Sequence, residues 1–554
     1  MPRGLVAGLS SLLAAACSSS STQPQLAPCT ATSAGSVSQV YAALTALDPL
    51  QTSGCAVFPD NATGAPIEYL LVPQSASTRV NDSSTFLLHG TAVVAAAAPR
   101  ASVRAAAEPG AQQRFDLALR RAERDLVIGP GRQLRPDLAP SAPVQALAPG
   151  DVRTFNVCGD TLCLTHPTVT ATAKTVGQHV AVFVDNTAAD TLATVDLNSL
   201  VAEFDTLLYP ADTAAFGHES DRDGNGRVIV LMTGAVNTLT PKSSCSRGSI
   251  VGYFYGGDLL TGFKGGNNAE IFFSVVPDPG AVLSCAHSVN DVKNAVPATF
   301  IHEFQHMISW GHHVSPSGIG APEQLWLNEG LSHYAEELGA RLFLPGDSAT
   351  FCHFVFGDLY NSGQYFLDPE ASFLVDDAGI GGLASRGAYW LFVRFLVDQF
   401  AAGQSVAQAN VVTRALDITT LIGATNVSHA TNTAFATIVQ RWGLANYLSD
   451  RPGFPTPATW QYVTWRFRTD YPAVHASCLA KIGTVKVPAA FPLTPDSAAG
   501  DTLDLSGVLR AGSGRYFLAQ QSAGAGAFTL LFSDGGGRAL HASLAPWLNV
   551  IRIQ

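Results

Sequence analysis

The sequence predicts a multi-domain α+β protein with small all-β domains at its N- and C-terminal ends. Its 554 residues suggest three or four domains, at about 150 residues per domain. Short apolar runs between Gly, Pro, Asn and Ser clusters indicate strands near both ends. After Pro297 the chain turns mainly helical. With 47% hydrophobic and 14% charged residues, the chain can build sizeable cores and does not belong to the disordered class.

Changes of composition divide the chain into six segments. The region at 93–149 is rich in Ala and Pro, and one helical stretch is predicted within it over 112–126. From residue 151 the pattern of apolar residues becomes that of an α+β domain, with strand-like runs such as 180–184. The predicted order is an export or lipoprotein signal at 1–17, a tether at 18–28, a small β domain at 29–92, a connector with one helix at 93–149, an α+β domain at 150–474 and a C-terminal β module at 475–554.

Residues 1–17 have the layout of an export signal, because Arg3 precedes a short apolar stretch that ends in small residues. The ending LAAAC resembles a bacterial lipoprotein signal, which is cut before the Cys that then carries lipid. Ala14 stands where Leu is usual, so an ordinary cleaved signal is the alternative. Beyond Cys17 no uninterrupted apolar run is long enough to span a bilayer. We predict an exported bacterial protein, lipid-anchored to the cell envelope through Cys17 or otherwise secreted.

Eight cysteines remain once Cys17 is set aside, an even number that suits disulfides in an oxidising compartment. Their spacing is not that of a structural zinc site. Pairing of sequence neighbours is the simplest arrangement, although the sequence alone leaves the connectivity open. These residues are Cys29, Cys55, Cys158, Cys163, Cys245, Cys285, Cys352 and Cys478.

The net charge bears on the partners of the protein. A formal charge of −11 disfavours nucleic acid and anionic membrane surfaces, because both repel an acidic chain. We therefore predict no nucleic-acid partner, and a membrane contact only through lipid on Cys17. The sequence leaves the oligomeric state open.

Residues His302-Glu303-Phe304-Gln305-His306 form an HExxH motif. On a helix its two histidines lie on one face, where their imidazoles can share a zinc ion. Pro297 suits a first helical position and Gly311 suits a stop, so we expect the helix to lie between them. Glu303 would project beside the metal face, where its carboxylate can accept a proton from zinc-bound water.

A catalytic zinc site needs a third protein ligand, and two residues are candidates. His312 has the spacing of the HExxHxxGxxH class, but Ser309 replaces the Gly of that class, and no methionine lies downstream for its Met-turn. Glu329 lies in the stretch WLNEGLSHYAEEL, where apolar residues recur at helical spacing. A carboxylate from this second helix would complete a His₂Glu site with a fourth position open for water. The predicted zinc ligands are His302, His306 and Glu329.

The segments HEFQHMI and WLNEGLSHYAEEL resemble the hyicolysin family of secreted bacterial zinc metallopeptidases, within the gluzincin group. The NEG element is also similar to the third-ligand segment of aminopeptidase N-type enzymes and, more loosely, to that of thermolysin. Weaker similarity covers about residues 151–450, including DRDGNGRVIVL. The resemblance implies that 150–474 is a zinc metallopeptidase domain with a thermolysin-like zincin core. It also implies zinc on the three ligands above, with Glu303 as general base and proton shuttle.

The chain departs from these families at several positions. The gap between the two motifs exceeds that of the aminopeptidases, so their exopeptidase specificity does not carry over. The thermolysin pattern has an Asp four residues after the third ligand, which orients a zinc-bound His, whereas this chain has His333. Aminopeptidases stabilise the oxyanion with a Tyr before a Lys-Gly pair, and the comparable segment at 384–387 lacks it. Tyr389, Tyr334 or His333 could substitute.

Two weaker patterns precede the HExxH motif. Asp221, Asp223 and Asn225 match the first half of an EF-hand-like calcium loop. Position twelve of that loop is Met232 instead of Glu, and a tight turn before a strand is the alternative. The run Asn267-Asn268-Ala269-Glu270 leads into an apolar strand. In gluzincins an edge strand in this order binds substrate backbone by β-addition, and an ordinary core strand is the alternative.

The sequence thus predicts an exported zinc-dependent metallopeptidase that cuts protein or peptide substrates internally, with Glu303 as the base. An exopeptidase on the same site is one alternative, and it would need an acidic anchor for the substrate amino group. A lipid-anchored binding or adhesion protein with structural zinc is the other, although such a site has no use for Glu303. Whether 29–149 is a removable pro-segment or a permanent domain stays open.

Overall fold

The computed structural model describes residues 24–27, 29, 35–91, 109–129, 146–379, 382–401, 406–483, 486–497 and 502–554. The predicted signal at 1–17, with Cys17, lies outside these residues, as do most of the tether and much of the connector. Helices and strands both contribute substantially, so the predicted α+β, multi-domain class is confirmed. Within the described ranges no helix has both the length and the apolar character needed to cross a membrane.

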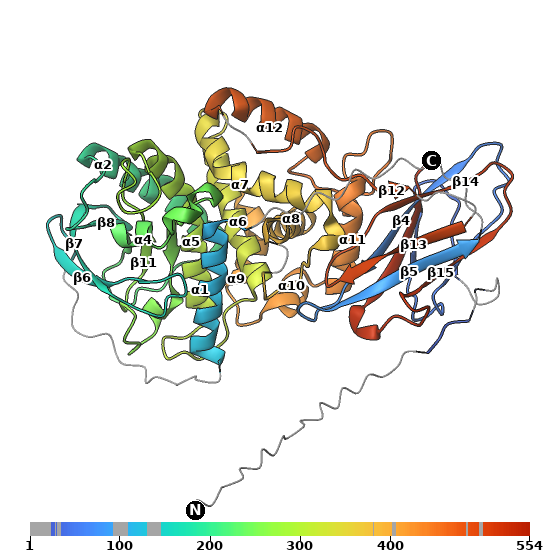
Figure 1. The fold of residues 1–554 in the computed structure, drawn as a ribbon, viewed down its shortest axis with the longest axis horizontal. Helices are drawn as coiled ribbons and strands as arrows, with labels where there is room; N and C mark the ends of the chain where they lie inside the picture. The colour runs from blue at the N-terminus through green and yellow to red at the C-terminus, as the bar shows by residue number, and fades with distance from the viewer. Residues whose placement is uncertain are drawn as a thin grey trace, which may run out of the picture.

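A six-stranded mixed sheet lies at one end of the elongated molecule (Figure 1). Its strand order is β10-β11-β9-β8-β7-β6. The central strands β11, β9 and β8 are parallel, whereas β10, β7 and β6 are antiparallel to their neighbours. Strands β8 and β9 are buried along their whole length, as their continuous apolar sequences require. The bounds are β6 Val152–Asn156, β7 Thr168–Val176, β8 Val180–Asp185, β9 Val228–Met232, β10 Gly252–Phe254 and β11 Ile271–Ser274.

Helices cover this sheet and continue into a helical centre. Helix α2 packs on β7 and β8, while α5 packs on β10 and β11. Helix α5 also contacts α6, which packs on α7 and α8. The prediction at 112–126 is confirmed as α1, which lies beside α5 in Figure 1. The helices are α1 Ala111–Ile128, α2 Thr194–Glu203, α3 Tyr209–Phe216, α4 Gly234–Thr238, α5 Val289–His313, α6 Leu325–Leu342, α7 Ser348–Leu367, α8 Gly382–Phe400, α9 Val406–Asp417, α10 Gly423–Thr431, α11 Phe435–Leu448 and α12 Phe467–Ile482.

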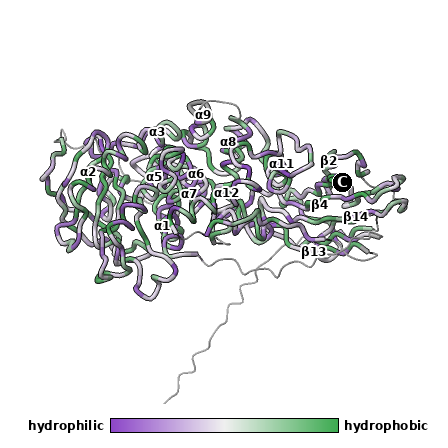
Figure 2. Tube along the Cα trace, turned by 90° about the horizontal axis from the view of Figure 1, so that it is seen from above, coloured by the Kyte–Doolittle hydropathy of each residue, from purple (hydrophilic) through white to green (hydrophobic). Residues whose placement is uncertain are grey.

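The strands of the two terminal regions form one β-sandwich. One sheet has the order β1-β3-β15-β5-β13, and the other has the order β12-β14-β4-β16-β2. Figure 2, turned by 90°, keeps these strands at one end and α2 at the other. The strands are β1 Gly35–Ser36, β2 Leu44–Leu47, β3 Cys55–Phe58, β4 Ile67–Ser75, β5 Ser83–Thr91, β12 Asp496–Ser497, β13 Thr502–Arg510, β14 Phe517–Gln521, β15 Phe528–Asp534 and β16 Pro546–Arg552.

The prediction of separate β domains at 29–92 and 475–554 is therefore wrong. Strand β4 lies between β14 and β16, and β5 lies between β15 and β13, so both N-terminal strands pair with C-terminal strands on each side. Local periodicity carries no information on such long-range pairing. The boundary at 474/475 also falls inside α12.

Helix α5 begins earlier than its sequence indicated. Pro297 lies inside the helix, eight residues after its start at Val289. Ser288 and Asp291 form a capping box: the Ser288 side chain accepts from the Asp291 backbone N–H, and the Asp291 side chain accepts from the Ser288 backbone N–H. This cap fixes the start, and the buried surroundings of the helix tolerate the missing N–H of Pro297. The end lies at His313, two residues beyond Gly311.

The four disulfides pair sequence neighbours, which confirms the simplest prediction. The last of them ties α7 to α12 across 126 residues. The bonds are Cys29–Cys55, Cys158–Cys163, Cys245–Cys285 and Cys352–Cys478.

Candidate metal centre

Helices α5 and α6 bring the three predicted zinc ligands together. His302 and His306 stand one turn apart on α5, and Glu329 comes from α6. The His302 Nε2 lies 3.8 Å from one Glu329 oxygen, and the His306 Nε2 lies 3.7 Å from the other. Zinc–ligand bonds near 2.1 Å with tetrahedral angles place ligand atoms roughly 3.4 Å apart. The cluster is thus close to the size that a zinc ion needs.

The chemistry of the donor set also fits a cation. The Glu329 carboxylate is 1% exposed, and neither of its oxygens accepts a hydrogen bond from the described residues. One of these oxygens forms an ion pair with Arg386, at 2.8 Å. Burial alone would raise the pKa of Glu329, but Arg386 and then His302 outweigh it and lower that pKa. An ionised, buried and under-bonded carboxylate beside two imidazoles is a ready metal ligand.

The Nδ1 atoms of both histidines have partners that leave Nε2 for a metal. His302 Nδ1 is 2.7 Å from a Glu336 oxygen, and His306 Nδ1 is 3.1 Å from the Asn328 side-chain oxygen. Acceptors at these positions favour the tautomer in which Nδ1 carries the proton and Nε2 carries the lone pair. Burial, then Arg120 and His302, hold the pKa of His306 well below its usual range. His306 is therefore neutral, as a metal ligand must be.

Glu336, and not the residue four positions after Glu329, forms a hydrogen bond with the predicted ligand His302. It stands seven residues after Glu329, two helical turns along the same face of α6. The residue at the fourth position, His333, pairs with Glu336 and with Asp358, at 3.0 Å each. Burial would lower the pKa of His333, but these two carboxylates raise it to about 10. His333 is thus a cation that holds Glu336 in place beside His302.

The predicted base, Glu303, is buried next to the cluster. One of its oxygens accepts a hydrogen bond from the backbone N–H of Phe254 at 3.0 Å. Burial, and then the nearby Asp116, raise the pKa of Glu303 well above its usual range, while Arg120 acts against them. The guanidinium of Arg120 lies 4.0 Å from the same Glu303 oxygen.

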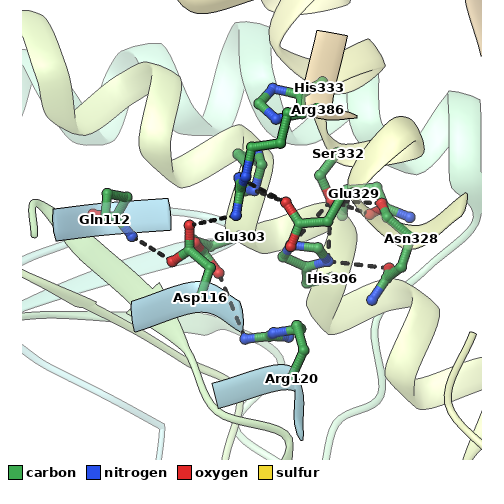
Figure 3. A network of polar contacts seen from close by, with 12 residues as sticks. Gln112, Asp116, Arg120, Glu303, His306, Asn328, Glu329, Ser332, His333 and Arg386 are labelled. Atoms are coloured by element: carbon green, nitrogen blue, oxygen red, sulfur yellow. Dashed lines mark hydrogen bonds and ion pairs between the residues drawn. The ribbon is translucent and has the colours of Figure 1, made fainter. Parts of the chain in front are cut away.

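Several side chains at this site were not singled out from the sequence. Figure 3 shows Gln112, Asp116 and Arg120 on α1, facing Glu303, with Arg386 between Asp116 and Glu329. Arg386 contacts Asp116 at 3.2 Å. The spacing of seven residues between Glu329 and Glu336 could have indicated that both lie on one face of a helix. No sequence pattern indicated the α1 residues, because α1 reaches the site only through tertiary packing.

The three candidates for oxyanion stabilisation occupy different places. The Tyr334 ring packs against Arg394 and Phe216 in the core. Tyr389 lines a pocket with Glu329 and donates its hydroxyl to Asp376 at 2.9 Å. His333 lines another pocket with Glu303. Tyr389 and His333 therefore stay candidates, and Tyr334 faces away from the pockets described here.

The rejected third ligand, His312, lies outside the cluster. Its Nδ1 is 3.6 Å from Asp417, on α9. Glu329, and not His312, lies in one group with the two motif histidines.

The predicted calcium loop has a different ligand geometry. Asp221 and Asp223 lie together with Glu270, whose oxygens come within 4.8 Å of theirs. The side-chain amide of Asn225 donates to Asp223 at 2.7 Å. Arg153 also pairs with Asp223, at 2.9 Å. These contacts suit the tight-turn alternative, and calcium at this loop stays a prediction.

The strand after Glu270 is not an edge strand. It is β11, which lies between β10 and β9, so the core-strand alternative holds. The described strands at the two edges of this sheet are β10 and β6, and the backbone N–H of Phe254 on β10 reaches Glu303. The sequence could not reveal this, because β10 joins the sheet by an antiparallel pairing beyond β11.

Comparisons with known proteins leave the family open. No protein-family model matches the chain, and no curated protein matches it. One similar solved structure is described as an aminopeptidase N family protein from Idiomarina loihiensis, with 10% identity and a TM-score of 0.31. The match covers 52% of this chain and 49% of that chain, about half of each. The resemblance to the hyicolysin family stays a prediction.

Proposed function

We propose that this chain is an exported zinc metallopeptidase that cuts polypeptides internally. The observation that carries the proposal is the cluster of His302, His306 and Glu329, with Glu303 lining the same pocket as His302. A site built only for structure would not place an extra buried carboxylate there. The four disulfides support export, because such bonds persist in oxidising compartments.

Each residue of the site has a definite task in this proposal. The imidazoles of His302 and His306 and the carboxylate of Glu329 would hold zinc, oriented by Glu336 and Asn328. When bound, zinc would supply Lewis acidity, and its charge would favour the ionised form of Glu303. Glu303 would take the proton of the attacking water and pass it to the leaving amine.

The edge of the sheet offers a place for the substrate backbone. The side of β10 that faces away from β11 has no neighbouring strand among the described strands, and an extended peptide that paired with it by β-addition would lay its carbonyls beside Glu303. Three carboxylates near the cluster, Asp116, Glu123 and Glu336, are each paired with an Arg or His side chain. An exopeptidase would need one of them free for the substrate amino group. Endopeptidase cleavage is therefore the better-supported mode.

Zinc content and casein hydrolysis of the purified full chain test this proposal. We expect one zinc per chain and measurable hydrolysis in the wild type. Glu303→Gln should keep its zinc and lose hydrolysis, because the base is gone, while Glu329→Ala should lose both. Asp190→Asn serves as the control, because Asp190 is exposed and lies well before the HExxH motif in the sequence. Full activity of Glu303→Gln would point to the binding-protein alternative. Hydrolysis rates on peptides with a blocked N-terminus, compared with rates on peptides with a free amino group, would separate endopeptidase from exopeptidase action.

The lipid anchor is a separate proposal. Cys17 lies outside the described residues, and its support is the LAAAC sequence. Radiolabelled fatty acid should enter the wild-type chain and not Cys17→Ala, whereas an ordinary signal would give no label in either.

A further inference from the structure

Helix α1 lies across the cleft beside the metal cluster, although it belongs to the connector and not to the catalytic segment (Figure 3). It turns a strongly polar face toward the site. Asp116, Arg120 and Glu123 on this face are 3%, 9% and 2% exposed. Asp116 pairs with Arg386, and Arg120 pairs with Glu123 at 3.1 Å and approaches Glu303. The helix therefore occupies the space directly in front of the base.

Side chains of α1 use the outward hydrogen-bonding groups of the edge strand. The Gln112 amide donates to the Gly252 carbonyl and accepts from the Val251 N–H, at 2.8 Å each. Gln112 thus satisfies one backbone donor and one backbone acceptor at the start of β10. Arg120 donates to the Phe254 carbonyl at 2.6 Å.

The same pattern continues past the end of β10. Glu123 accepts from the Gly256 N–H at 2.6 Å. Together these contacts bind backbone groups from Val251 to Gly256 that an extended substrate would otherwise pair with. A substrate backbone and α1 cannot use this edge at the same time.

The pockets around the cluster show that α1 divides one cleft. Three separate pockets each combine α1 side chains with a residue of the proposed site. Gln112 and Asp116 line one with His302 and Glu303. Leu117 lines the second with Glu329, and Arg120 lines the third with His306. Helix α1 thus borders every one of these three pockets.

Helix α1 depends on its docking for stability. Gly110 at its N-cap has no side chain to cap the helix. Arg114 lies in its first turn and Asp125 in its last, and both charges are unfavourable to the helix dipole. An 18-residue helix with such ends is marginal by itself. Once undocked, α1 would lose much of its helical structure, so its folding and its docking are coupled.

We propose that α1 is an intramolecular inhibitor that occupies the substrate-binding edge of β10, and that its displacement raises peptidase activity above the low level of the intact chain. The inference rests on the proposed peptidase function. It assigns the inhibitory role to 109–129 alone, because the strands at 35–91 are built into the sandwich. The partner that α1 replaces is an extended polypeptide backbone.

Controlled excision of α1 tests the proposal. Sites for a sequence-specific protease are placed in the chain near residues 100 and 137, on either side of α1. After cleavage and removal of α1, casein hydrolysis should rise several-fold with zinc content unchanged. Hydrogen exchange at the amides of Val251 and Gly256 should accelerate, because α1 side chains accept from both, and this reports on the edge strand independently of activity. A synthetic peptide of residues 109–129 should restore inhibition, and the same peptide with Gln112→Ala should inhibit more weakly.

A point variant in the intact chain covers the case in which excision damages the fold. Gln112→Ala should raise hydrolysis, because it frees backbone groups of Val251 and Gly252, and Asp125→Ala on the exposed face of α1 should not. Unchanged or lower hydrolysis in the excised chain and in Gln112→Ala would overturn the proposal, as would loss of zinc on excision. Absence of hydrolysis in every form, with Glu303→Gln no different from wild type, would instead refute the peptidase function itself.

Discussion

Glu336 connects the metal cluster to a buried charge network. One of its oxygens lies within 3.0 Å of both His302 Nδ1 and His333 Nδ1. Burial would raise the pKa of Glu336, but His333 and the hydrogen bond with His302 lower it to about 2. Glu336 is therefore ionised throughout the neutral range and orients His302 for metal binding.

Glu336→Gln should weaken zinc affinity by about 10–100-fold, because a neutral amide orients His302 less firmly. Competition with a chelator of known affinity measures the change. Asp358→Asn is the matched control: Asp358 also pairs with His333 but does not reach His302. An equal loss of affinity in both variants would show that the effect comes from His333 and not from the contact with His302.

At the residue scale the sequence predicted the cluster because its chemistry is local to two helices. The spacing of four residues places His302 and His306 together whatever the rest of the fold does. Arg386 was different. It sits on α8, and its contact with Glu329 depends on the packing of α8 against α6, which periodicity does not report.

At the element scale, the burial of Glu203 at the end of α2 makes the free energy of unfolding depend on pH. One of its oxygens is buried without a hydrogen bond from the described residues. Burial, and then Asp347 at the N-cap of α7, raise the pKa of Glu203 to about 7. The folded state thus holds a proton that the unfolded state has released above its ordinary pKa of 4.5. Stability falls as pH rises between these two values.

Glu203→Gln should remove the titrating carboxyl, so the free energy of unfolding should depend less on pH. Relative to wild type, the variant should gain about 1–2 kcal/mol between pH 4.5 and 7, a figure reduced for solvent screening. Chemical denaturation at a series of pH values measures the difference. Other buried acids such as Glu270 have the same sign, so only the difference between the two proteins isolates Glu203. Parallel curves for both proteins would refute the assignment.

The elements themselves were predicted unevenly, for physical reasons. Helices α1 and α6 were found because their apolar residues repeat every three or four positions. The start of α5 was misplaced because Pro297 was given more weight than the capping box at Ser288 and Asp291. The edge role of β10 was missed because the order of strands within a sheet is a long-range property.

At the scale of the whole molecule, the two ends of the chain stabilise each other. The sandwich core contains Phe58 and Phe86 from the N-terminal region and Phe532 from the C-terminal region. The sandwich also docks on the helical centre, since the Tyr516 hydroxyl donates to the Gly443 carbonyl of α11 at 2.7 Å. The N-terminal strands are thus a permanent part of the fold, whatever happens to α1.

This arrangement predicts that damage at the C-terminal end unfolds the N-terminal strands. Leu530 on β15 is fully buried between β3 and β5, so Leu530→Asp should place a charge in the shared core. Hydrogen exchange should then accelerate at 55–58 and 83–91, which lie far from Leu530 in the sequence. Truncation after residue 494 should also accelerate exchange at 67–75, because β4 loses both of its neighbouring strands. Zinc content in the same samples reports whether the α5–α6 pair remains folded. Two independent β domains would instead leave exchange at 35–91 as slow as in the wild type.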